Sequence, residues 1–108
     1  MSIVVHLFYT GADGAACRFA EEMESSGIAQ RIRSEEGNLR YDYFRPLSDP
    51  ETILLIDEWK DQAALDQHHA SEMMQELAML RNKYDLHMKA ERYISEEMPA
   101  SDQPFIRK

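Results

Sequence analysis

Cysteine and basic residues are scarce in this chain. It has one cysteine, Cys17, among 108 residues, and 12 Lys and Arg against 20 Asp and Glu. A single cysteine cannot form a disulfide within the chain and is typical of a protein of the reducing cytoplasm. The formal net charge of -8 repels the phosphate backbone of nucleic acid. We therefore expect a cytoplasmic protein with no nucleic-acid partner.

Long apolar runs are also missing. No run in the sequence approaches the roughly 20 apolar residues that a membrane-spanning helix needs. The first residues, Met1–Val5, have no basic leader and continue directly into a strand pattern, unlike a signal peptide. We expect no membrane partner.

Motifs for metals and nucleotide cofactors are absent as well. The histidines, His6, His68, His69 and His87, are scattered without the HExxH spacing of a zinc site and without a cysteine partner. The chain has no GxGxxG motif and no phosphate-binding loop. We expect neither a metal nor a cofactor.

The composition that remains is that of one globular domain. With 44% apolar and 30% charged residues, the chain has enough apolar side chains for a single core and enough polar ones for its surface. We predict one domain over residues 1–95. Residues 96–108 form a polar C-terminal tail with two prolines and the apolar pair Phe105 and Ile106. This tail is either frayed or packed on a partner subunit.

Hydrophobic periodicity predicts four strands and two helical connections. Residues 3–9, 39–44, 52–59 and 86–94 alternate or run apolar as strands do. An apolar stripe with helical spacing covers residues 16–32, with Gly27 as a candidate break. Asp61 and Ser71 are candidate N-caps of two short helices before the last strand.

The resulting order, β-α-β-β-α-β, predicts an α+β fold of the ferredoxin-like split type. In this arrangement helices cover one face of a four-stranded antiparallel sheet. The other face would remain apolar and open, and a second copy packed face to face is the simplest cover for it. We therefore predict a homodimer.

Two segments carry a family resemblance. Glu35–Tyr41 (EEGNLRY), then Asp57–Leu65 (DEWKDQAAL) followed by His68, resemble the antibiotic biosynthesis monooxygenase family. The resemblance implies a ferredoxin-like domain that forms a dimeric α/β barrel. The family includes quinol monooxygenases, polyketide oxygenases that use no cofactor, haem-degrading enzymes and an isomerase of a phosphorylated autoinducer.

The resemblance departs from some of these branches at particular residues. Where haem-degrading members have an axial histidine, this chain has Glu76–Met79, and Leu55 stands about where polyketide oxygenases have an asparagine. Met73 and Met74 replace the second histidine and aromatic residue common in the family. Trp59 is the main residue in which this chain resembles the oxygenases of the family.

His68 and Trp59 are the candidate catalytic residues. An imidazole titrates near neutral pH, and His68 would lie on a helix over the sheet, where it can act as a base. The ring of Trp59 can form the wall of a pocket, and its indole N–H can donate to a substrate or peroxide oxygen. Structural roles, a helix bridge for His68 and core packing for Trp59, are the alternatives.

His6, Tyr41, Tyr43 and Met74 are the candidate substrate-binding residues. His6 lies in the middle of an apolar strand, and Tyr41 and Tyr43 share one strand face. Methionine side chains such as Met74 adapt well to flat apolar ligands. Ordinary core packing is the competing role for each of them.

Three functions remain open on the sequence. The first is a cofactor-independent monooxygenase that oxidises a quinol or polycyclic phenol with dioxygen. The second is an isomerase of a small phosphorylated carbonyl compound, which would need a cationic phosphate contact such as Arg40 or Arg45. The third is a dimer that binds a small ligand without turnover.

Overall fold

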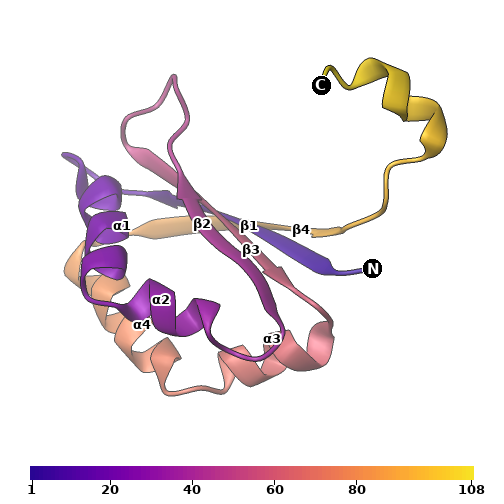
Figure 1. Cartoon of the computed structure of the whole chain (residues 1–108). Helices are drawn as coiled ribbons and strands as arrows, with labels where there is room; N and C mark the ends of the chain where they lie inside the picture. The colour runs from indigo at the N-terminus through magenta and orange to yellow at the C-terminus, as the bar shows by residue number, and fades with distance from the viewer.

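A computed structural model describes residues 1–108 as four strands, four α-helices and a short C-terminal 3₁₀ helix (Figure 1). The order along the chain is β1 (Ile3–Thr10), α1 (Ala15–Ser25), α2 (Ile28–Arg33), β2 (Asn38–Phe44), β3 (Thr52–Trp59), α3 (Gln62–His69), α4 (Met73–Lys83), β4 (His87–Ile94) and the 3₁₀ helix (Ala100–Phe105).

The strands form one antiparallel sheet in the order β2-β3-β1-β4. This confirms the predicted α+β split arrangement, with the first and third strands in the centre. The register pairs Ile3 with Trp59 and Tyr9 with Ile53, so the odd-numbered residues of β1 and β3 share a face.

The four helices cover this face only (Figure 1). Tyr9, Leu55 and Trp59 of the central strands are fully buried there against helix residues such as Phe19 and Met23. Burial of these large side chains supplies most of the driving force for folding.

Two local features differ from, or add detail to, the sequence prediction. The helical stretch over residues 16–32 is two helices, because Gly27 adopts a left-handed φ of 84° between α1 and α2. The prediction that Ser71 caps the last helix is wrong, since the N-cap of α4 is Glu72 and makes no side-chain cap. The Ser71 hydroxyl instead donates to the carbonyl of His68 at 2.7 Å.

The opposite face of the sheet has no cover within the chain. Its side chains come from the even-numbered residues of β1 and β3, among them Phe8, Leu54 and Ile56, all of which are partly buried. The segment after β4 extends away from the body of the domain, and its 3₁₀ helix has no buried residue (Figure 1). None of the helices is long and apolar enough to cross a membrane.

Candidate functional site

Helix α3 presents one of its two adjacent histidines to the interior. The Asp61 carboxylate accepts a hydrogen bond from the N–H of Ala64 at 2.9 Å, and this cap fixes where the helix begins. Helical spacing then directs Ala64, Leu65 and His68 toward the sheet, where all three are buried. His69, about 100° further round the helix, is exposed.

The buried His68 has a carboxylate on one side and an indole on the other. Its Nδ1 lies 3.0 and 3.1 Å from the two carboxylate oxygens of Glu35. Its ring stacks on that of Trp59, with centroids 4.7 Å apart. Because a carboxylate only accepts hydrogen bonds, Nδ1 carries the proton and Nε2, which has no hydrogen bond within the chain, is left as the acceptor.

The charge state of His68 reflects two opposing influences. Burial lowers the pKa of His68 below its ordinary value, while the hydrogen bond and charge of Glu35 raise it. Burial is the larger influence, so the ring is neutral at neutral pH and its Nε2 can accept a proton.

A tight turn brings Glu35 to this helix. Gly37 has a φ of 83°, and its carbonyl accepts a hydrogen bond from the N–H of Lys60 at 2.8 Å. A Cβ atom at Gly37 would lie only 2.5 Å from the Cβ of Ala64, so only glycine lets the turn approach α3 this closely. The turn at Gly37 therefore places the Glu35 carboxylate against His68.

A second buried carboxylate lies on the other side of the indole. The Nε1–H of Trp59 donates to Oδ1 of Asp57 at 2.5 Å. Asp57 is 5% exposed, and burial raises its pKa to about 7, although the bond from Trp59 opposes this. The indole hydrogen that we expected to reach a substrate or peroxide oxygen is thus directed at Asp57.

Three buried polar atoms of the structure have no hydrogen-bond partner. Nη2 of Arg81 donates to the hydroxyl of Tyr9 at 2.8 Å, whereas its Nε has no partner. The hydroxyls of Tyr41 and Tyr43 are also buried without a partner, and the two rings meet edge to face at 5.8 Å. Since an unsatisfied buried polar group is costly, such groups are concentrated where a ligand binds.

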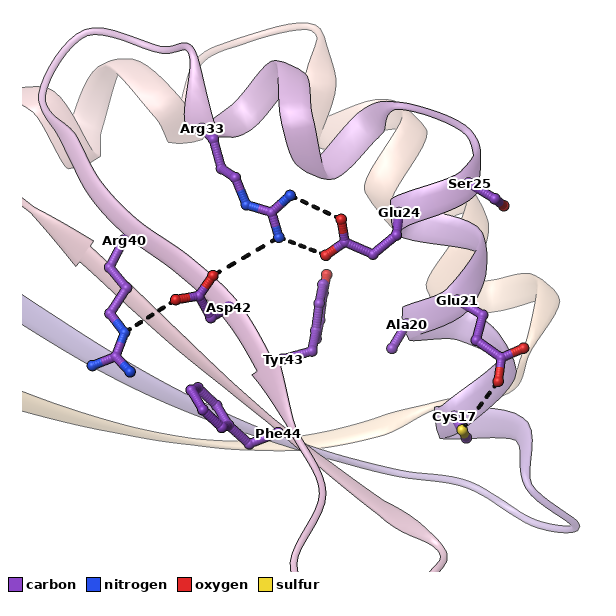
Figure 2. Close-up of a pocket in the computed structure, with 10 residues that line it drawn as sticks. All are labelled: Cys17, Ala20, Glu21, Glu24, Ser25, Arg33, Arg40, Asp42, Tyr43 and Phe44. Carbon is purple, nitrogen blue, oxygen red and sulfur yellow. Dashed lines mark hydrogen bonds and ion pairs between the residues drawn. The ribbon is translucent and has the colours of Figure 1, made fainter.

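The largest hollow in the structure is a groove of about 930 Å³ between α1 and the edge strand β2 (Figure 2). Figure 2 shows the Arg33 guanidinium paired with the Glu24 carboxylate on one side of the groove, with the Tyr43 side chain pointing toward that carboxylate. No cavity in the structure is lined by Trp59 or His68. Of the residues that line the groove, Ala20 belongs to the buried core and Tyr43 packs against it.

Comparison with known proteins assigns the chain to a family. The family model described as "Antibiotic biosynthesis monooxygenase" matches residues 2–79, which is more than half of the chain. The chain belongs to the antibiotic biosynthesis monooxygenase family. The match includes β3, which carries Trp59, and α3, which carries His68.

Individual family relatives are more distant. YcnE of Bacillus subtilis (strain 168), provisionally named a monooxygenase, is 37% identical over 46 residues, which are 43% of this chain and 48% of YcnE. The matched stretch thus spans about half the length of this curated relative.

Two solved structures show the same fold. A Deinococcus radiodurans protein with a provisional family name has a TM-score of 0.77 at 21% identity, over 90% of this chain and 95% of its own. SnoaB of Streptomyces nogalater, a cofactor-independent oxygenase, has a TM-score of 0.74 at 12% identity, over 92% of this chain and 97% of its own.

Within this family fold, the structure gathers most of the residues that we selected from the sequence. Trp59, His68, Tyr41 and Tyr43 lie between sheet and helices, and Met74 packs on the same core from α4. His6 does not join them. It lies on the open face of the sheet, 4.9 Å from the ring of Tyr93.

Sequence reasoning gave no role to Tyr9, Glu35, Asp57 or Arg81. Strand alternation could have indicated Asp57, because it lies two residues before Trp59 on a strand whose other odd positions are apolar. Glu35 stands in the segment that carries the family resemblance, but only the folded turn shows its contact with His68. Nothing in the local sequence distinguishes Arg81 from the exposed basic residues of a helix.

Proposed function

We propose that the protein is a cofactor-independent monooxygenase that oxidises a quinol or polycyclic phenol with dioxygen. The observation that supports this most directly is the buried His68, held by Glu35 and stacked on Trp59. A base of this kind, neutral at neutral pH and shielded from water, suits removal of a phenolic proton. The family assignment, and the fold shared with SnoaB, agree with this chemistry.

The proposed reaction needs only the substrate and dioxygen as electron donor and acceptor. Nε2 of His68 takes the phenolic proton, and Glu35 stabilises the imidazolium that forms. The electron-rich anion passes an electron to dioxygen, and the two radicals combine to form a C–O bond. The peroxide takes back the proton held by His68. Cleavage of its O–O bond, with loss of the remaining hydrogen from the same carbon, leaves one oxygen on the substrate as a carbonyl and releases the other as water.

The unpartnered polar atoms provide the contacts for the substrate oxygens. The hydroxyls of Tyr41 and Tyr43 are neutral donors, because burial raises the pKa of both. The free Nε–H of Arg81 is a cationic donor that favours a phenolate over a neutral phenol. Met74 supplies adaptable apolar surface beside them.

Oxygen uptake tests the proposal. Metal-stripped, flavin-free protein is mixed with a panel of reduced quinones and anthrone-like phenols, and uptake is compared with the spontaneous rate. His68→Ala and Trp59→Phe should lower the uptake, and loss of a general base typically costs about 10²–10⁴ in rate. His69→Ala is the matched control, since this neighbouring histidine is exposed and should keep the wild-type rate. No uptake by the wild type over the whole panel contradicts the oxygenase.

The same experiment separates the isomerase, which consumes no oxygen. That alternative needs a cation for a phosphate group near His68. Arg40 pairs with Asp42 at 3.3 Å on the surface, and Arg45 is exposed, so neither joins the buried cluster. Arg81, the cation of the buried cluster, would serve a phosphate as well as a phenolate, so oxygen uptake is the measurement that separates the two reactions.

We also propose that the working form is a homodimer that closes an α/β barrel. The partly buried Phe8, Leu54 and Ile56 on the open sheet face would be covered by the same face of a second copy. The tail contributes exposed apolar side chains at Met98 and Phe105, which we expect to pack on the partner subunit. The free thiol of Cys17 suits a cytoplasmic location.

A further inference from the structure

The buried cluster and the main groove are adjacent but separate in the structure. No cavity reaches Trp59 or His68, so a substrate needs a path to them. The groove between α1 and β2 is lined by Ala20 of the core and by Tyr43, which packs on the core, whereas a second hollow, of about 140 Å³, reaches the core only at Ala64 of α3. The ring of Tyr43 also contacts that of the fully buried Tyr41 edge to face.

We propose that this groove binds a flat aromatic molecule and is the entrance to the buried cluster, with the Arg33–Glu24 ion pair as its closing contact. The proposal rests on the proposed function, since it names the route by which the substrate reaches the same site.

The side chains of the groove suit an aromatic ligand. Tyr43 and Phe44 provide aromatic surface on the two sides of the edge strand β2, and the short side chain of Ala20 lies on the helix across from Tyr43 (Figure 2). The Arg40 guanidinium lies 5.3 Å from the centre of the Phe44 ring and can cover a second ring in the same way. The hydroxyl of Tyr43 is buried without a partner and becomes available to a phenolic oxygen when the groove opens.

The Arg33–Glu24 ion pair can separate at a small cost in free energy. Arg33 holds the Glu24 carboxylate through two hydrogen bonds of 2.8 and 2.5 Å, and these bonds raise the pKa of the guanidinium. Glu24 belongs to α1 and Arg33 to α2, and the break at Gly27 separates the two helices. The Glu24 side chain is 46% exposed, and ion pairs that reach solvent are weak, so the pair can part at small cost.

Arg33 also has a structural contact, and this decides which residue to change. Its Nε–H donates to the carbonyl of Tyr41 at 2.8 Å, so replacing Arg33 would disturb the edge strand as well. Glu24→Gln keeps the shape of the side chain and removes the nearer of the two carboxylate charges on the guanidinium, while Asp42 stays 4.0 Å away.

Cys17 provides a direct reporter, because it is the only thiol of the chain and lines the groove. The probe is 1,8-dihydroxyanthraquinone, which is already oxidised and so reports binding whether or not the protein turns it over. Cys17 is alkylated with N-ethylmaleimide in the full-length protein with and without the probe. At a probe concentration about ten times its Kd, the alkylation rate should fall roughly tenfold, because only free protein reacts.

A thiol placed elsewhere is the control. In the double variant Cys17→Ala, Gln75→Cys, the thiol lies on an exposed position of α4 away from the groove, and its alkylation should not respond to the probe. In the converse experiment, Cys17 is labelled after folding with a bulky maleimide, and this label should abolish probe binding while the same label at position 75 does not.

The ion pair is tested by the rate at which the probe binds. Glu24→Gln should raise this rate roughly two- to fivefold, the factor by which an exposed ion pair shifts an equilibrium. Glu76→Gln is the matched control, since Glu76 pairs with Arg31 at 3.1 Å outside the groove. An equal rate in both variants and the wild type overturns the ion pair as the closing contact.

The outcomes separate this proposal from the proposed function. Oxygen uptake with no protection of Cys17 overturns the groove as entrance and leaves the oxygenase standing. Protection of Cys17 without uptake supports the groove and contradicts the oxygenase. If deletion of residues 96–108 alone makes the alkylation of Cys17 faster, the groove holds the tail of a second copy and the proposal is wrong. If the protein neither binds the probe nor takes up oxygen, both proposals are overturned.

Discussion

The imidazole of His68 stacks on the indole of Trp59, with ring centroids 4.7 Å apart and ring planes inclined by 26°. The stack fixes the plane of the histidine, and the bond from Nδ1 to Glu35 fixes its rotation within that plane. Together they leave Nε2 as the single reactive position of the ring. The orientation and the pKa of His68 therefore depend on the carboxylate of Glu35, which lies 33 residues earlier in the chain.

Replacing Glu35 with glutamine should lower the pKa of His68 further. The Glu35 carboxylate raises this pKa through its hydrogen bond and charge, and the influences that would remain, burial and the charges of His69 and Arg81, all lower it. An NMR titration of the His68 ring protons measures the change. Glu36→Gln is the control, because Glu36 is exposed and pairs with Lys60 instead, and equal pKa values in the two variants would refute the pairing.

Asp57→Asn should stabilise the protein above pH 7 and have little effect near pH 4. Burial raises the pKa of Asp57 from its ordinary 3.8 to about 7, so between these values the folded protein keeps a proton that the unfolded chain has lost. The wild type therefore loses stability as the pH rises through this window, by up to about 4 kcal/mol at about 1.4 kcal/mol per pKa unit. Asparagine carries no charge at any of these pH values.

Urea unfolding at pH 4, 6 and 8 measures this difference. The free energy of unfolding should fall with pH in the wild type and stay flatter in the variant. A constant difference between the two proteins over the three pH values would show that Asp57 has an ordinary pKa. Asp66→Asn is the control, since Asp66 is an exposed carboxylate on the outer side of α3.

The fold could be predicted from the sequence, whereas the site could be predicted only in part. Periodicity in β1 and β3 and the cap at Asp61 act locally, so they predict the strands, the helices and the inward direction of His68. The partners Glu35 and Asp57 are different, because their contacts with His68 and Trp59 depend on which segments the fold brings together. His6 shows the same limit: alternation separates the two faces of β1, but it does not say which face the helices cover.

Gly37→Ala should destabilise the protein more than Gly27→Ala. Both glycines have a positive φ, which costs another residue about 1–2 kcal/mol. At Gly37 the added Cβ would also lie 2.5 Å from the Cβ of Ala64, whereas at Gly27 it meets nothing within 4 Å. This clash adds about 1–3 kcal/mol. Urea unfolding compares the two variants, and equal losses would mean that the turn does not press on α3 as described.

Ile56→Lys should convert the proposed homodimer to a monomer. Ile56 faces the open side of the sheet opposite His6, and a lysine in the centre of a face-to-face interface would be a buried, unpaired charge. Light scattering should then give the chain mass of 12.6 kDa for the variant and twice that mass for the wild type. Met79→Lys is the control, since Met79 is 71% exposed on α4 and its replacement should leave the dimer intact. A wild type with the mass of one chain would refute the dimer itself.

Trp59→Phe should raise the pKa of Asp57 and leave the carboxyl protonated at neutral pH. The indole N–H stabilises the charged form of Asp57 at 2.5 Å, and phenylalanine has no hydrogen to donate. Loss of one hydrogen bond to a charged group corresponds to about 1.5–3 kcal/mol, or one to two pKa units. The ¹³C resonance of the Asp57 carboxyl, followed from pH 5 to 10, measures the shift. Tyr43→Phe is the control, because the Tyr43 hydroxyl makes no hydrogen bond to Asp57. If both variants titrate like the wild type, the indole does not set the charge of Asp57, and the effect of Trp59→Phe on oxygen uptake must come from its stack with His68.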